Sequence, residues 1–254
     1  ATVMWHQTFG GPGFDRGMSV IRHPGGDLWA ATTTQAGTKE ADIRLLRLSA
    51  NGKERQLQRL RGGGEDQVVA IVRRGAGALL AGSGRASEEA PWEGRIIALG
   101  NRSQVLWKQP VRFADGCKIT AVAVGRKGGT IAAGSAWVAG SESKVFVAHI
   151  GQGGRIKWIR DDKRLRNATV SGVVLTGRRH FALLAIGKRA GCAAGAWLLG
   201  YRGKRPRWTA PIGGDAMAKG GALIRTGKYG LVAVGGVHDR GRGFSDGWLA
   251  RTGR

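Results

Sequence analysis

The 254-residue sequence contains only two cysteines and six prolines, and it has no long apolar run. Cys117 and Cys192 lack the C-x-x-C spacing of structural metal sites and of haem attachment, which excludes a cysteine-based metal site. No apolar run reaches the roughly 18 residues that a membrane-spanning helix needs. Apolar stripes with helical periodicity are also missing, so the sequence favours many short strands joined by tight turns.

Acidic charge is scarce as well, since 17 Asp and Glu residues stand against 41 Lys and Arg residues, a formal net charge of +24. Such an excess bears on partners and solubility rather than on the fold. It indicates an anionic partner, such as nucleic acid, an acidic glycan, anionic lipid or an acidic protein. The alternative is a generally basic proteome or a solubility device.

The start of the chain and its glycine content add two further expectations. The sequence begins Ala1-Thr2-Val3 without an initiator methionine, as a processed protein would, so we expect a periplasmic or secreted location. Glycine is abundant, at 45 residues, but without a three-residue period, which excludes a collagen-like chain. Hydrophobic residues make up 42%, enough for a substantial core.

An internal repeat organises the whole sequence. Tryptophan recurs at Trp5, Trp107, Trp158 and Trp208, with Gln56 in the same position of a divergent copy, at steps of 51, 51, 51 and 50 residues. After four of these five positions comes a loop with an acidic residue: Asp15, Asp66, Asp115 and Asp215. The copy after Trp158 has "DDKRLRN" instead and departs from the pattern.

Each loop leads into an apolar strand, a tight turn and a second strand, as in "VVAIVRRGAGALLAGS". A variable loop and a third strand follow, and a polar turn then delivers the chain to the next tryptophan strand. Four strands in about 50 residues is the signature of a β-propeller blade, and five units suit a closed ring. The alternative, a parallel β-helix or another solenoid, needs polar caps at its open ends.

The two ends of the chain favour the ring. The last unit supplies three strands and ends with "DGWLARTGR", whereas the first residues, "ATVMWHQTFGG", form a strand without a partner. We therefore predict an all-β, five-bladed propeller of four-stranded antiparallel blades, in which the N-terminal strand completes the last blade and removes free sheet edges. The predicted single domain, 1–254, contains units at about 5–55, 56–106, 107–157, 158–207 and 208–254.

The repeated residues carry a resemblance. The pattern D-x-W-L-x-R followed by G, W, F-G-G, D, G-G and A-A-G-S resembles the degenerate tryptophan- and glycine-rich propeller repeats of exported bacterial proteins. The resemblance covers essentially the whole chain, but it concerns the fold alone. Propellers of this kind include enzymes, binding modules and complex subunits, so it implies no function.

The predicted turns between the first and second strands of each unit are basic. They contain Arg22, Arg73, Arg74, Arg126, Lys127, Arg178, Arg179, Arg225 and Lys228. On the same predicted side of the blades we find only two acidic residues, Asp27 and Glu54. A plain solvated surface mixes both signs, so we predict that these cations bind an anionic partner. The alternative is that exposed tight turns simply favour Lys and Arg.

Catalytic chemistry is weakly indicated. Asp15, Asp66, Asp115 and Asp215 suggest a glycosidase, but a glycosidase needs two carboxylates in different environments. Equivalent positions in successive repeats favour a shared structural task, such as accepting backbone N–H groups. The five histidines are scattered and have no metal-ligand spacing. The sequence predicts no metal and no cofactor, and it favours a non-enzymatic protein while leaving an enzyme open.

A second contact surface is expected at the loops between the second and third strands. Trp92 and Trp137 lie there outside the periodic positions, and the insert "GVHDRGRGFSD" supplies His238, Arg240 and Arg242. Exposed loop tryptophans stack on sugars or anchor protein partners; the alternative is that they fold onto their own loops. Cys117 and Cys192 fall in loops of neighbouring units, so a disulfide and two free thiols both remain open.

These observations predict a non-enzymatic binding or scaffold module, exported by a bacterium. Its basic turns would dock an acidic protein assembly, an envelope polymer or an anionic lipid surface. One alternative is a carbohydrate-binding or carbohydrate-active propeller that uses the acidic loops. The other is a nucleic-acid-binding propeller, whose affinity would fall steeply with salt.

Overall fold

The computed structural model describes residues 2–10, 14–35, 41–60, 64–212, 217–227, 230–238 and 245–252. All secondary structure in these residues is β, in eighteen strands. None of the described residues belongs to a helix that is long and apolar enough to cross a membrane. The chain divides into two compact units, residues 1–112 and 113–254. The single-domain organisation stays a prediction.

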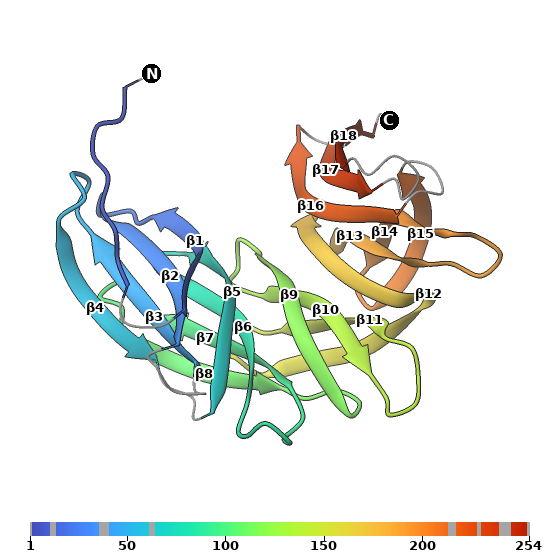
Figure 1. Ribbon diagram of the computed structural model, residues 1–254, viewed down its shortest axis with the longest axis horizontal. Helices are drawn as coiled ribbons and strands as arrows, with labels where there is room; N and C mark the ends of the chain where they lie inside the picture. The colour runs from blue at the N-terminus through green and yellow to red at the C-terminus, as the bar shows by residue number, and fades with distance from the viewer. Residues whose placement is uncertain are drawn as a thin grey trace. The chain divides into compact units, whose positions relative to one another are not determined.

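The first unit contains two four-stranded antiparallel sheets, each with its strands in chain order (Figure 1). The strands of the first sheet are β1 (Phe14–Arg22), β2 (Leu28–Gln35), β3 (Ala41–Leu48) and β4 (Glu54–Leu60). Those of the second sheet are β5 (Glu65–Arg74), β6 (Gly77–Arg85), β7 (Glu93–Leu99) and β8 (Val105–Val111). One core fills the space between the two sheets, with the fully buried Trp29, Leu45 and Leu99 among its members.

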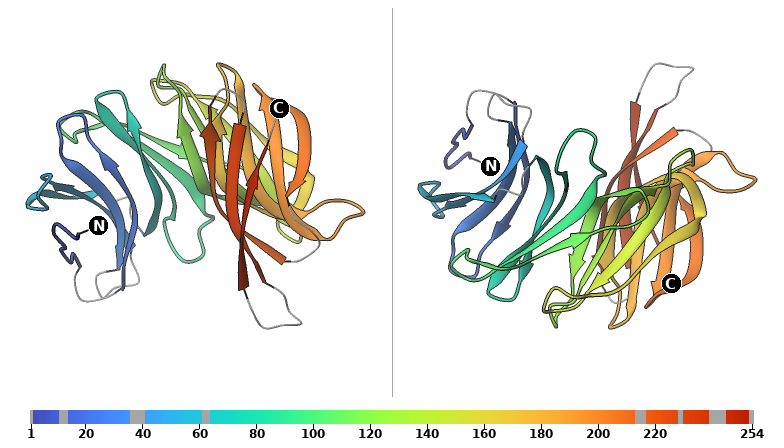
Figure 2. Two further views of the ribbon diagram at one scale, coloured as in Figure 1. Left: turned by 90° about the horizontal axis from the view of Figure 1, so that it is seen from above. Right: turned by 90° about the horizontal axis from the view of Figure 1, so that it is seen from below.

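The second unit contains a seven-stranded antiparallel sheet and a three-stranded one (Figures 1 and 2). The larger sheet consists of β9 (Gly116–Val124), β10 (Thr130–Trp137), β11 (Lys144–Ile150), β12 (Ile156–Leu175), β13 (His180–Lys188), β14 (Ala194–Arg202) and β15 (Arg205–Ile212). The smaller consists of β16 (Met217–Thr226), β17 (Gly230–His238) and β18 (Ser245–Arg251). One face of β16–β18 packs its Leu223, Leu231 and Ala233 against the β12–β15 part of the larger sheet.

Strand β12 explains why one sheet has seven strands. Its 20 residues serve as the fourth strand of one repeat, where Ile156 to Asp162 pair with β11. They then serve as the first strand of the next repeat, where Arg166 to Leu175 pair with β13. Asn167, with φ 46°, lies where the strand passes from one partner to the other. The deviant stretch "DDKRLRN" is therefore continuous strand rather than the predicted loop.

A β-bulge recurs at the repeated tryptophan position. Trp107 lies opposite Ala98, Trp158 opposite His149 and Trp208 opposite Gly200, and the residue before each tryptophan is left out of the pairing. Gln56 lies opposite Arg47 with the same irregularity. A bulge adds one residue to one strand and increases the local twist. Its recurrence in four strands shows that the repeat is structural as well as sequential.

The predicted strand pattern is confirmed for the described residues, but its closure is not tested. The tight turn between β5 and β6 uses Gly75 in the left-handed region, with φ 60°. A Cβ on Gly77 would collide with the carbonyl oxygen of Leu99 on the neighbouring strand. In contrast, the described residues 2–10 contain no strand, and β16–β18 is a sheet of three strands. Ring closure and the number of blades therefore remain predictions.

Candidate anion-binding turns

The turns of each unit fall on two opposite sides, because its strands run up and down in chain order. In the second unit, β9 and β16 both pack against β12. The strands β9 and β16, and the second half of β12, are each the first strand of a repeat. Equivalent strands of successive repeats run in the same direction, so their carboxyl ends lie at the same end of the unit. We call this end the turn side. It contains the turns after the first and third strands of each repeat, and the opposite end is the loop side.

The turn side of the second unit exposes cations from all three repeats. Arg126 and Lys127 occupy the turn between β9 and β10, and both are exposed. Arg178 and Arg179 occupy the turn between β12 and β13 and are also exposed, and so is Arg225 near the end of β16. Lys228 lies outside the described residues. The structure therefore brings together most of the predicted cations of this unit.

In the first unit, some of the predicted cations are exposed to solvent and one packs against a tryptophan. Arg22 and Arg73 are exposed. Arg74 is half-buried, with its guanidinium carbon 5.5 Å from the centre of the Trp107 ring. A guanidinium over an indole is a cation–π contact, so Arg74 supports its own sheet and presents less charge to a partner than its neighbour Arg73.

Of the two acidic residues among the described positions of the turn side, Asp27 is neutralised by arginines and Glu54 is exposed. Asp27 is buried, and its carboxylate oxygens lie 3.3 Å from Arg47 and 3.2 Å from Arg55. Glu54 is exposed at the start of β4. Two guanidinium groups around one carboxylate leave the positive charge in excess, so Asp27 does not offset the exposed arginines.

On the loop side, three of the described acidic residues contact arginines or a backbone group. Asp66 is buried and forms an ion pair with Arg95. The carboxylate of Glu93 lies 2.7 Å from Arg112 and 3.4 Å from Arg95. The Oδ2 atom of Asp115 accepts a hydrogen bond from the backbone N–H of Ala139, at 2.7 Å. This agrees with the predicted structural task for Asp115, whereas Asp66 meets a guanidinium instead.

The repeated acids therefore have different partners in different repeats. Asp15 is half-buried in β1, and Asp215 lies outside the described residues. No group of three His, Cys, Asp or Glu side chains within the described part of the chain is arranged to hold a metal ion. The described side chains assemble a basic surface more clearly than they assemble a pair of catalytic carboxylates.

Asp162 is a buried charge that the sequence analysis missed. It occupies the position four residues after the repeated tryptophan, where the other repeats bury Leu60, Val111 and Ile212. Its carboxylate accepts hydrogen bonds from the side chain of Arg164, at 2.6 Å, and from the hydroxyl of Tyr201. An acidic residue in an otherwise aliphatic repeat position is the signal that could have revealed it.

These partners set the ionisation of the cluster. Burial alone would raise the pKa of Asp162, but the hydrogen bonds from Arg164 and Tyr201 outweigh it and hold the pKa below its ordinary value. Burial and the nearby carboxylate raise the pKa of Tyr201, which therefore stays protonated and donates to Asp162. Arg164 also donates to the carbonyl oxygen of Trp208, at 2.7 Å. The cluster is hydrogen-bonded throughout, as a buried charge requires, and it ties β12 to β14 and β15.

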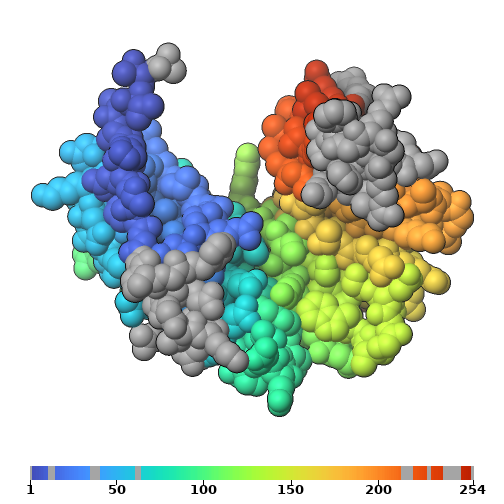
Figure 3. Space-filling view, in the orientation of Figure 1, coloured from blue at the N-terminus to red at the C-terminus, as the bar shows by residue number. Residues whose placement is uncertain are grey.

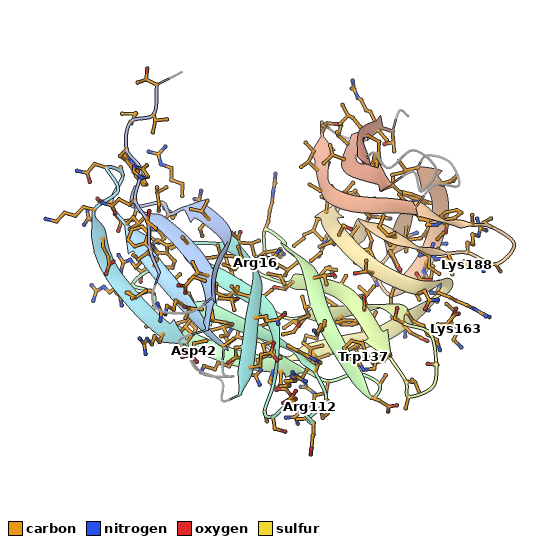
Figure 4. All side chains as sticks on the ribbon, in the orientation of Figure 1. Arg16, Asp42, Arg112, Trp137, Lys163 and Lys188 are labelled. Carbon is orange, nitrogen blue, oxygen red and sulfur yellow. The ribbon has the colours of Figure 1, made fainter. Side chains whose placement is uncertain are left out.

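The two tryptophans of the second predicted contact surface are only partly exposed. Trp92 is half-buried, with Arg85 at 5.1 Å from its ring centre. Trp137, labelled in Figure 4, is half-buried over Gly116, where an added Cβ would lie 2.8 Å from its ring. The side chain of His238, and all of Arg240 and Arg242, lie outside the described residues. Cys117 is buried and Cys192 exposed, and the two form no disulfide with each other.

Comparison with known proteins identifies the architecture. No protein-family model matches the sequence, and no curated protein matches it. An α-L-arabinanase of Penicillium chrysogenum, complexed with arabinobiose, superposes with a TM-score of 0.58 at 9% identity, covering 92% of this chain and 79% of the enzyme. The α-L-arabinofuranosidase Arb93A of Fusarium graminearum gives a TM-score of 0.56 at 8% identity, with 94% and 92% covered.

A subtype N11 neuraminidase-like protein of A/flat-faced bat/Peru (H18N11) is similar to the same degree, with a TM-score of 0.56 at 9% identity, covering 88% of this chain and 68% of that one. These three neighbours share the β-propeller fold.

The chain has a β-propeller fold.

Each four-strand repeat is thus a blade, with β12 shared between the third and fourth. At such low identity the likeness shows the fold alone, and the activities of these neighbours do not pass to this chain.

Proposed function

We propose that the chain forms a closed, five-bladed β-propeller that acts as a non-enzymatic binding module and docks an anionic partner on its turn side. The observation that supports the docking most directly is the exposure of Arg73, Arg126, Arg178 and Arg225 in the turns of four repeats. Opposing charge on this side is confined, among the described residues, to the paired Asp27 and to Glu54.

The contacts of Trp5 support ring closure. Gln56, at the tryptophan position of the first blade, accepts a hydrogen bond from Ser103, a residue with positive φ in the turn between β7 and β8 of the next blade. Trp5 lies over Gly52, the positive-φ residue in the same turn of the first blade, and donates to the carbonyl oxygen of Ala50 at 3.0 Å. Trp5 thus relates to the first blade as Gln56 relates to the second.

From this equivalence we infer that Trp5 belongs to the strand position that precedes the first blade, which in a five-bladed ring is part of the fifth. Figure 3 shows the N-terminal segment, in dark blue, lying along the surface of the first unit. A strand in that position would pair with the free edge of β18 and leave no unpaired sheet edge at the junction.

A bare apolar face also supports closure. On β16–β18, Val234 lies opposite Leu249, and both point away from the core together with Ile224. Leu249 is 73% exposed and Ile224 is 56% exposed. Exposed apolar faces of this kind mark interaction surfaces, and closing the ring would cover this one.

We further propose that the protein works outside the bacterial cytoplasm, with an acidic protein assembly, an envelope polymer or an anionic lipid surface as its partner. Cations around one side of the molecule attract such a partner through their summed field, at a screening length of roughly 8 Å in physiological salt. Individual salt bridges need not form before the two surfaces meet.

A pull-down from the envelope fraction tests this function. The variant carries Arg73→Glu, Arg126→Glu, Arg178→Glu and Arg225→Glu. Its matched control reverses four exposed cations of the loop side: Arg16, Lys163, Arg166 and Lys188. We expect the turn variant to lose acidic partners that the wild type and the control retain. An unchanged set of partners in the turn variant would defeat the docking proposal.

A carbohydrate-binding or carbohydrate-active propeller is the second candidate, because the similar structures include an arabinanase and an arabinofuranosidase. The described loop-side carboxylates do not favour it, since Asp66 is paired with Arg95 and Asp115 with a backbone N–H. Asp66→Asn and Asp115→Asn should leave binding unchanged under our proposal. Loss of sugar binding or turnover in a folded Asn variant would favour the carbohydrate function instead.

A further inference from the structure

We infer that the turn side recognises the flat surface of an anionic phospholipid bilayer, an inference that rests on the proposed anion docking and names its partner. In the second unit the described connections on this side are short: residues 125–129, 151–155, 176–179 and 203–204. Connections of two to five residues hold their side chains close to the strand ends, so the described turns include no long loop that could wall a groove.

The composition of these turns is as simple as their shape. They consist of glycine, Arg, Lys, Gln and Thr, and the described positions hold no aromatic or large apolar side chain. Gly128, Gly154 and Gly203 have φ of 73°, 89° and 57°, which permits the tight reversal without a side chain. Protein interfaces concentrate their affinity in buried aromatic and apolar anchors. The described turns offer none, which disfavours an acidic protein as the main partner.

The cations, in contrast, are spread over the whole of this side. Arg126 and Arg178 follow β9 and β12, the first strands of their repeats, and Arg225 lies near the end of β16. Arg155 and Arg202 lie at the turns before the fourth strands. All five are exposed. Small anions need convergent donors around one point, and a single polymer chain needs a groove. A two-dimensional array of phosphates matches a level, two-dimensional array of cations. The geometry therefore favours a bilayer surface, contacted through charge and without insertion.

Binding of this kind has a predictable strength. Each basic residue close to an anionic bilayer raises partitioning roughly fivefold, and the effect decays within a Debye length. Reversing two turn arginines removes two favourable contributions and adds repulsion, so we expect partitioning to fall by at least about twenty-fivefold. Because the described turns carry no aromatic or large apolar side chain to insert, salt should release the protein.

The experiment is co-sedimentation of the full chain with vesicles of equal parts phosphatidylglycerol and phosphatidylcholine, and with phosphatidylcholine vesicles alone. The double variant Arg126→Glu/Arg178→Glu tests the turn side. Its control is Lys163→Glu/Lys188→Glu, which makes the same change in net charge at two exposed lysines of the same unit (Figure 4). Circular dichroism melts should show that both variants are folded.

We expect wild type and control to sediment with anionic vesicles only, and the turn variant to stay in solution. Equal loss in both variants would show that net charge alone acts and would overturn the inference. Wild type that ignores anionic vesicles, yet still binds heparin through the turn arginines, would overturn the lipid partner and leave anion docking intact. A wild type that binds neither vesicles nor heparin would refute both proposals.

Discussion

A disulfide between the two ends of the chain provides a direct probe of ring closure, because the repeat fixes its register. The same register recurs in the four repeats whose strand at the tryptophan position is described. Gln56 lies opposite Arg47 and the next residue, Leu57, lies opposite Leu46. In the same way, Trp208 lies opposite Gly200 and Thr209 opposite Leu199. Carried to the fifth blade, this register places Trp5 opposite Arg251, His6 opposite Ala250 and Gln7 opposite Leu249.

Two double cysteine variants follow, His6→Cys/Ala250→Cys and Gln7→Cys/Leu249→Cys, each with Cys192→Ser to remove the exposed thiol. Neighbouring pairs in an antiparallel ladder alternate between wide and close spacing, so one of the two has the geometry that a disulfide prefers. The bond would close a loop of about 245 residues. Constraining the unfolded chain in this way is worth up to about 5 kcal/mol in the chain-entropy model.

The assay compares urea unfolding midpoints and non-reducing gel mobility with and without reductant. We expect a monomeric disulfide and a reductant-sensitive gain in the free energy of unfolding of about 2–4 kcal/mol, below the ceiling because engineered bonds are strained. The control Gln7→Cys/Ala250→Cys is out of register, with its side chains on opposite faces. Equal bond formation in that control, or disulfides only between molecules, would refute the register and the closure.

Further predictions concern buried and stacked charges. Asp162→Ala should destabilise the chain by about 3–5 kcal/mol in urea unfolding, because it leaves Arg164 buried without its carboxylate. Replacing Asp162, Arg164 and Tyr201 together by Leu, Met and Phe should recover most of that loss; an equally unstable triple variant would contradict this account. Asp162 has a lowered folded pKa, so its stabilisation is complete above its ordinary pKa of 3.8 and disappears as the pH falls through the lower folded value; Asp162→Asn should flatten that acid limb of the stability curve. Burial, with Lys157 nearby, lowers the pKa of His149 below 6.5, so stability should fall as the pH drops below 6.5, and His149→Gln should remove that slope. Arg74→Ala should cost about 0.5–1 kcal/mol through its lost stacking on tryptophan, measured against a near-neutral Arg73→Ala.

The sequence was sufficient to predict the strands, because alternating apolar residues and glycine turns repeat with one period. The second strand of every repeat lies where the pattern predicts it, whereas the predicted N-terminal tryptophan strand is not a strand among the described residues 2–10. The same logic did not reveal that "DDKRLRN", which departs from the repeated loop pattern, is continuous strand. The polarity of its residues is satisfied by contacts with distant strands, such as that of Asp162 with Tyr201, and no local pattern reports such contacts.

The candidate site was predictable in composition but not in exposure. Arg73 and Arg74 are adjacent and alike in sequence, yet one is exposed and the other lies over Trp107. Neighbouring residues of a strand point to opposite faces of the sheet, so Arg73 and Arg74 meet different surroundings at the end of β5. Likewise, the loop-side acids looked equivalent in the repeat, whereas Asp66 pairs with Arg95 and Asp115 accepts a hydrogen bond from the backbone N–H of Ala139.

The most direct test of the turn side as an anion-docking surface is the salt concentration at which the protein leaves an immobilised polyanion. The comparison uses Arg126→Glu/Arg178→Glu/Arg225→Glu and the equally charged loop-side variant Lys163→Glu/Arg166→Glu/Lys188→Glu. Our account predicts that the first elutes at much lower salt than the wild type and that the second elutes close to it. Equal shifts in the two variants would show that the cations act by number alone and would contradict the account.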